Sequence, residues 1–314
     1  MSAAAAAQQA PFLQINLPNT PKGAAVLFED SRGGLWLGGA ESGREGLTYF
    51  DGSRFILPVS AFPKVFVNGM AEDSDGGLLI SSNDGVYRLL GGRLERVLVG
   101  AHFGLTKVAR DIFLTIVTPP GKERTDADLV RIKRLEGSWK DETVARSTPA
   151  AFLSDDRRGT ILYVCRGGFC ELRKDDVVSW HPGLTLAIQR HALSTPLAGL
   201  VSRDRFGCIW MRGRASAMVQ CDGETEPRVL PPGVGGLGQQ RALELDDGSV
   251  AIPSMYTLAF GRPGNFRVLT RANGYPSVMS TLVTRDGCIW LSNSDGLFVF
   301  PTRLDAEFGQ SATA

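Results

Sequence analysis

The stretch EDSRGGLWLGG, residues 29–39, decides the fold of this chain. It joins a polar turn containing Asp30 to two glycines and a short apolar strand centred on Trp36. The same grammar recurs as AEDSDGGLLISS (71–82), FLSDDRRGTILYV (152–164), VSRDRFGCIWMRG (201–213), LELDDGSVAIPS (243–254) and LVTRDGCIWLSNS (282–294). The glycines of this stretch therefore belong to the turn and strand of a repeated structural unit, and a phosphate-binding loop is not needed to explain them.

The spacing of the units gives their number. Trp36 and Trp290 lie 254 residues apart, and six steps divide this interval into units of about 42 residues each. The step from Leu79 to Leu162 is twice as long as the others, which predicts a degenerate copy at ARDIFLTIV (109–117). The chain is therefore predicted to contain seven units.

Each unit continues in the same way after its second strand. A Gly opens a third strand, as in GLTYF (46–50), and an Asp-Gly or Gly-Gly turn leads to a fourth. No segment keeps a helical period over 12 residues. Four antiparallel strands repeated seven times predict an all-β, seven-bladed β-propeller. The N-terminal segment 11–18 is predicted to supply the fourth strand of the last blade and so close the ring.

The domain prediction follows directly. We expect a disordered tail at 1–10, one propeller over 11–308 and a tail at 309–314. The predicted units cover 24–67, 68–107, 108–148, 149–192, 193–240, 241–278 and 279–308, the last completed by the strand at 11–18.

The phrase EDSRGGLWLGG…GLTYF, echoed by TRDGCIWLSNSDGLFVF, resembles the two-component regulator propeller repeat. That repeat forms the sensor region of bacterial membrane-bound histidine kinases and diguanylate cyclases. The resemblance implies a periplasmic or otherwise extracytoplasmic sensor that binds a small molecule, with a saccharide as one candidate, without catalysis and without a cofactor. It also implies a partner, the downstream signalling domains of the parent receptor, for which this sequence has no segment.

Composition excludes several classes of protein. A net charge of +1 provides no general attraction to nucleic acid, and no apolar run is long enough for membrane insertion. The five cysteines show no metal-ligand spacing. Cys165 and Cys170, in CRGGFC, either form a cross-strand disulfide or are two small buried side chains.

Residues that recur at equivalent positions in several units are predicted to be structural, because an active site needs a unique constellation. They are Asp30, Asp73, Asp204 and Asp286 in the polar turns, and Trp36, Trp210 and Trp290 in the second strands. GVGGLG (233–238) matches a dinucleotide fingerprint in letters only, since neither a strand precedes it nor a helix follows it.

Function is expected where the units differ. The loops between second and third strands and the loops between blades share one face of a propeller. The candidate ligand-binding residues there are Arg44, Asn83, His102, Arg166, Arg212, Arg214, Tyr256, Tyr275, Asn293 and Asp295. The plain alternative is that they are ordinary solvated loop residues. Two other functions stay open: a propeller enzyme of the streptogramin-lyase or glycosidase type, and a protein-interaction scaffold.

Overall fold

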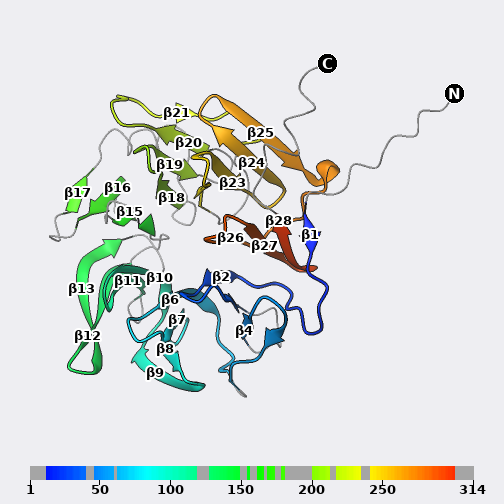
Figure 1. Ribbon diagram of the computed structural model, residues 1–314. Coiled ribbons are helices and arrows are strands. Elements are labelled where there is room, and N and C mark those ends of the chain that lie inside the picture. The colour runs from blue at the N-terminus through cyan, green and yellow to red at the C-terminus, as the bar shows by residue number, and fades with distance from the viewer. Residues whose placement is uncertain are drawn as a thin grey trace.

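The computed structural model describes most of the chain. The described residues are 12–39, 46–59, 62–118, 127–148, 154–155, 161–165, 168–173, 178–180, 200–212, 217–234 and 241–300. They form seven four-stranded antiparallel sheets arranged around a ring (Figure 1). The prediction of an all-β, seven-bladed propeller is confirmed.

Six sheets use four consecutive strands each, numbered here as sheets 1 to 6. Sheet 1 contains β2 (Val26–Glu29), β3 (Leu35–Gly38), β4 (Leu47–Phe50) and β5 (Phe55–Ile56). Sheet 2 contains β6 (Val67–Glu72), β7 (Leu78–Ser82), β8 (Gly85–Leu90) and β9 (Arg93–Val99). Sheet 3 contains β10 (His102–Ala109), β11 (Ile112–Val117), β12 (Ala127–Leu135) and β13 (Ser138–Thr148).

The remaining sheets follow the same plan. Sheet 4 contains β14 (Ser154–Asp155), β15 (Ile161–Cys165), β16 (Gly168–Leu172) and β17 (Val178–Trp180). Sheet 5 contains β18 (Leu200–Arg203), β19 (Ile209–Arg212), β20 (Ala217–Gln220) and β21 (Arg228–Val229). Sheet 6 contains β22 (Leu243–Glu244), β23 (Val250–Pro253), β24 (Thr257–Arg262) and β25 (Asn265–Thr270), followed by the 3-10 turn η2 (Arg271–Asn273).

The seventh sheet closes the ring with strands from both ends of the chain. It contains β26 (Ser280–Val283), β27 (Ile289–Asn293) and β28 (Gly296–Phe300), and its outer strand is β1 (Leu13–Gln14). Leu13 pairs with Val299 in antiparallel register, as Figure 1 shows at the right of the ring. Phe12 is buried beside Phe300, with ring centroids 4.8 Å apart, so an aromatic contact supports this short strand. The predicted closure by the N-terminal strand is confirmed.

The polar turn between first and second strands is built around one carboxylate. Asp30 Oδ1 accepts hydrogen bonds of 3.0 Å from the amides of Arg32 and Gly34, and Oδ2 accepts one of 3.1 Å from Trp36 Nε1. Asp204 repeats this pattern with Trp210 Nε1 at 2.8 Å. The turn aspartate therefore fixes both the hairpin and the indole that packs between neighbouring sheets.

The last turn departs from the predicted equivalence of Asp286 with Asp30. Thr284 occupies the Asp30 position, since its amide donates to the Cys288 carbonyl at 3.0 Å in the way that Asp30 donates to Gly34. Asp286 lies two residues later and accepts from the Thr284 hydroxyl at 2.6 Å and the Cys288 amide at 3.1 Å. Trp290 is accordingly less buried than Trp36 and Trp210.

The turns between first and second strands lie at one end of the ring, which we name the clasp end. Polar contacts that we call clasps join adjacent sheets there. In each clasp the residue after the turn's first position donates its backbone amide and its side chain to a carboxylate of the next sheet. The four pairs are Ser31 with Glu72, Ser74 with Asp111, Arg205 with Glu244, and Arg285 with Glu29. The last pair joins sheet 7 to sheet 1, so the ring is closed a second time.

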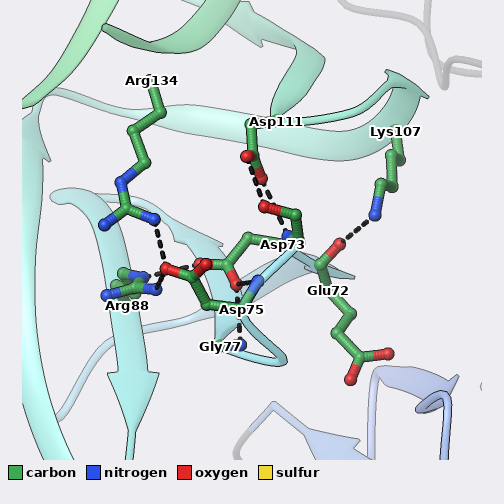
Figure 2. A network of polar contacts seen from close by, with 9 residues as sticks. Glu72, Asp73, Asp75, Gly77, Arg88, Lys107, Asp111 and Arg134 are labelled. Carbon is green, nitrogen blue, oxygen red and sulfur yellow. Dashed lines mark hydrogen bonds and ion pairs between the residues drawn. The ribbon is translucent and has the colours of Figure 1, made fainter. Parts of the chain in front are cut away.

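Figure 2 shows the clasp between sheets 2 and 3 with the charges around it. Asp111 receives the Ser74 amide at 2.8 Å, and Arg134 of β12 is paired with Asp75 in the same turn. Lys107 donates to the Glu72 carbonyl at 2.8 Å. These three contacts all join sheet 2 to sheet 3.

Two disulfide-bonded regions lie in sheets 4 and 5. Cys208 and Cys221 form a disulfide across the β19–β20 hairpin, where they flank the paired residues Ile209 and Gln220. Cys170 is also disulfide-bonded. Because the Cys165 side chain lies outside the described residues, its pairing with Cys170 stays a prediction. Cys288 is a free thiol.

We expect the substitution Asp30→Asn to lower the free energy of unfolding by about 1–3 kcal/mol near neutral pH, because a buried network loses its charged acceptor. Burial alone would raise the pKa of Asp30, but the hydrogen bonds from Arg32, Trp36 and the Gly34 amide hold it below its ordinary value of 3.8. The charged form thus stabilises the fold above pH 3.8, and this stabilisation is lost as the pH falls through the lower folded pKa. Urea unfolding of both proteins checks this: the difference should shrink toward about pH 3, and an unchanged difference would contradict it.

Candidate functional site

The second end of the ring, which we name the loop end, carries the loops between second and third strands and the loops between sheets. Seven of the predicted ligand-binding residues can be placed there. Three others, Arg44, Arg166 and Arg214, lie outside the described residues. The placed residues fall into two separate groups.

Arg212 is the most buried charged side chain of the first group. It ends β19, is 2% exposed, and its Nη1 donates to the backbone carbonyl of Pro253 in sheet 6. Burial lowers the pKa of Arg212 to about 10, so the guanidinium stays charged at neutral pH. The corresponding position, two residues after the repeated Trp36 position, is Gly38 in sheet 1 and Ser292 in sheet 7. The arginine is thus a feature of this sheet and not of the repeat.

Tyr275 lies on the other side of β23 from Arg212. It follows η2, is buried, and its hydroxyl donates to the Ser254 carbonyl at 2.9 Å. Arg212 and Tyr275 therefore bind the carbonyls of two consecutive residues. Burial raises the pKa of Tyr275, so the phenol is neutral. Its ring also meets Phe12 edge-on, with centroids 5.6 Å apart, which connects this site to the closing strand of the ring.

Tyr256, Asn293 and Asp295 continue the same group toward sheets 6 and 7. Tyr256 stands at the exposed tip of the β23–β24 loop. Asn293 ends β27, and its Oδ1 accepts from the amides of Asp295 at 2.7 Å and Gly296 at 3.1 Å. We name the group of Arg212, Tyr256, Tyr275, Asn293 and Asp295 the arc.

The arc is continuous because backbone hydrogen bonds link its loops. The amide of Val278 donates to the Met255 carbonyl at 3.1 Å, and that of Met279 donates to the Ser292 carbonyl at 2.8 Å. The amide of Gly23 donates to the Asn293 carbonyl at 2.7 Å, which extends the arc to sheet 1. Five of the predicted residues therefore gather from sheet 5 to sheet 7.

The second group contains Asn83 and His102, on sheets 2 and 3. Asn83 is exposed, and its Oδ1 accepts from the Phe66 amide at 3.1 Å. His102 was expected in a loop between blades, but it is the first residue of β10 and is 1% exposed. Its Nδ1 has no hydrogen-bond partner among the described residues. The sequence alone did not place this histidine in a strand because the third unit is degenerate.

His102 lies in a bulged strand, β10, beside a second bulged strand, β6. The sequence analysis predicted neither bulge. Asn68 is an extra residue in β6, and its Nδ2 donates to the His102 carbonyl at 2.9 Å. β10 is bulged after Phe103. Gly69 permits the close approach of the two strands, because a Cβ there would lie 2.5 Å from the Leu105 amide nitrogen. Glycines at 69 and 104 were the available signal.

Among the described residues, no group of three or more His, Cys, Asp or Glu side chains is arranged to hold a metal ion. In that same part of the chain, no helix has the length and apolar character needed to cross a membrane. The loop end therefore offers hydrogen bonds, one buried positive charge and exposed aromatic surface.

Comparison with solved structures identifies the same architecture elsewhere. The extracellular domain of a hybrid two-component system from B. thetaiotaomicron superposes with a TM-score of 0.67 at 13% identity, over 96% of this chain and 42% of that one. A streptogramin B lyase superposes with a TM-score of 0.65 at 9% identity, over 92% and 96%. The structure titled YCF48 bound to D1 peptide gives 0.62 at 13% identity, over 93% and 97%.

These likenesses show the fold. The chain spans about two fifths of the length of the extracellular domains that it matches, 42% of one and 39% of another. No protein-family model matches the chain, and no curated protein matches it. The protein is thus a seven-bladed propeller whose fold is shared with extracellular domains of two-component systems, with a streptogramin B lyase and with YCF48.

We expect the free energy of unfolding to fall as the pH drops below about 6.5. Below that pH His102 binds a proton in the unfolded state but stays neutral in the folded state. Burial lowers the pKa of His102, and the nearby Val99 carbonyl and Asp141 offset this only in part. Unfolding of His102→Phe and wild type between about pH 7 and pH 5 measures the effect, since the ring of Phe cannot be charged. Parallel curves for the two proteins would contradict it.

Proposed function

We propose that this protein is the extracytoplasmic, non-catalytic sensor ring of a bacterial two-component-type receptor, which binds a small molecule at its loop end. The observation that carries the proposal is the difference between the two ends. At the clasp end the polar residues repeat and bind neighbouring sheets. At the loop end some buried polar residues also repeat, since Ser82 and Asn293 each accept the amide of the residue three positions later. Arg212 and Tyr275 instead occur in single sheets and bind backbone carbonyls around the arc. Polar residues that the repeat does not require are where recognition is expected.

The cysteines support the proposed extracytoplasmic location. Disulfides persist in oxidising environments and are rare in the cytosol. Cys208 and Cys221 are joined, and Cys170 is disulfide-bonded as well. The architectural likeness to extracellular domains of two-component systems points the same way. The signalling domains that would receive the message belong to the parent receptor, as the repeat resemblance implies.

The ligand test is a thermal-shift screen of the whole chain against saccharides, organic anions and divalent metal ions. A ligand at about one hundred times its dissociation constant adds about 2.7 kcal/mol to the stability, which shifts the melting temperature by several degrees. We expect Tyr256→Ala to weaken the shift and Phe206→Ala to leave it unchanged. The two aromatic side chains are 58% and 59% exposed and lie at opposite ends of the ring, so they form a matched pair.

The opposite result for these two variants would move the binding site to the clasp end and refute the proposal. Turnover that depends on a metal ion would instead assign the ring to an enzyme, which is the alternative that the lyase architecture represents. Absence of stabilisation by any ligand class would favour a protein-interaction scaffold.

The compartment test uses the disulfide between Cys208 and Cys221, which are 13 residues apart. Removing it with the double substitution Cys208→Ser and Cys221→Ser should lower the free energy of unfolding by about 3 kcal/mol, because a loop of this size is released in the unfolded chain. Cys288→Ser is the control, since that thiol is free. Alkylation and mass spectrometry of the protein from the periplasm should find the Cys208–Cys221 bond intact, and alkylated thiols at both positions would contradict an extracytoplasmic site.

A further inference from the structure

Three exposed apolar side chains meet at one place on the loop end. Tyr256 is 58% exposed, Met279 45% and Met255 38%. Met255 and Tyr256 form the tip of the β23–β24 loop, and Met279 immediately precedes β26. The hydrogen bond from the Val278 amide to the Met255 carbonyl, 3.1 Å long, brings the two segments side by side. We name these three residues the methionine rim.

The ring does not require this apolar surface. The backbone of Met279 donates to the Ser292 carbonyl at 2.8 Å, and Ala25 makes the same bond to Gly38 at 2.9 Å in sheet 1. An alanine therefore serves the architecture as well as a methionine does. Single apolar residues on a surface are ordinary, whereas a group of them beside polar residues is typical of a binding surface.

One buried polar atom lies on the side of β27 that faces the rim. Asn293 Nδ2 is buried and has no hydrogen-bond partner among the described residues. Asn293 alternates with Ile289 and Leu291, which pack with sheet 6, and sheet 6 carries Met255 and Tyr256. A buried amide N–H without an acceptor is costly, and a ligand that supplies the acceptor removes that cost.

We propose that the methionine rim binds a small ligand that combines an aromatic ring with a hydrogen-bond acceptor such as a carboxylate. The ring lies against the two thioethers and Tyr256, because sulfur and aromatic rings attract one another. The acceptor faces Asn293 Nδ2. A saccharide is the weaker match, since sugars stack on aromatic faces and the rim offers one ring and two thioethers. The inference rests on the proposed function and specifies its ligand.

Methyl-labelled methionine NMR tests the inference directly. The chain has six methionines, and Met70, Met211 and Met218 are buried in the core, so they serve as internal references. Met255→Leu and Met279→Leu assign the two rim signals. Titration with phenylacetate or indole-3-acetate should move the methyl protons of Met255 and Met279 upfield, because an aromatic ring shields protons above its face. Glucose and maltose should leave them in place.

A matched pair of variants measures the contribution of the rim to binding. Met255→Ser should weaken binding of the aromatic acid about two- to tenfold. Leu90→Ser, whose side chain is 40% exposed at the clasp end, should leave binding unchanged. Both sites are exposed, so both variants should fold.

The inference is overturned if the sugars shift the rim methyls and the aromatic acids do not, or if neither class shifts them. In the second case a ligand that stabilises wild type and loses its effect in Tyr256→Ala would still uphold the proposed function. The failure of the ligand class and the failure of the sensor are thereby distinguished.

Discussion

Each sheet of this ring buries both of its faces against its two neighbours, and the rest of the structure depends on that constraint. Trp36 illustrates it, since its ring belongs to sheet 1 but packs with Val67 and Met70 of sheet 2. A lone sheet would leave such side chains in water, so the seven sheets stabilise one another in sequence. The same constraint demands that sheet 7 meet sheet 1. β1 completes the outer edge of sheet 7, and the Arg285–Glu29 clasp joins sheet 7 to sheet 1 at the clasp end.

The two ends of the ring separate the residues that stabilise it from those that we propose bind a ligand. The turn carboxylates and clasps occupy one end of the ring and repeat with the blades. The loop end also joins sheets, as the bond from Arg212 to the Pro253 carbonyl does, but its sheets differ: Arg212 stands where sheet 1 has Gly38, and His102 begins a bulged strand. Variation in its exposed loops leaves the clasps intact, because the clasps lie at the opposite end.

Much of the fold was predictable because the repeat is local. The turn aspartate, the glycines and the second-strand tryptophan lie within eight residues of one another, and their recurrence gave the number of blades and the closing strand. The clasps were not predicted, because they join residues far apart in the sequence: 41 positions for Ser31 and Glu72, and 256 for Arg285 and Glu29. The Cys208–Cys221 bond was also missed, although both cysteines flank the second and third strands of one unit. Asp286 was misaligned with Asp30, since letters alone do not show that Thr284 begins that turn.

The candidate site was predictable only as a face of the ring. Loop membership placed Arg212, Tyr256, Tyr275, Asn293 and Asp295 on one face, whereas their burial and partners follow from the packing of sheets 5 to 7. Nothing in the local sequence around Tyr275 indicates that its hydroxyl reaches the Ser254 carbonyl, because 21 residues separate them.

The pairing of Leu13 with Val299 has a consequence for the order of events during synthesis. The outermost strand of the last sheet is made before sheets 1 to 6, and its partner strand is made after them. Sheets 1 to 6 can form and stack as they emerge, whereas the seam must wait until β28 has been made. Until then β1 has no partner strand and Phe12 has no Phe300 ring beside it. Closure of the ring is therefore a late step of folding, which follows the stacking of the other sheets.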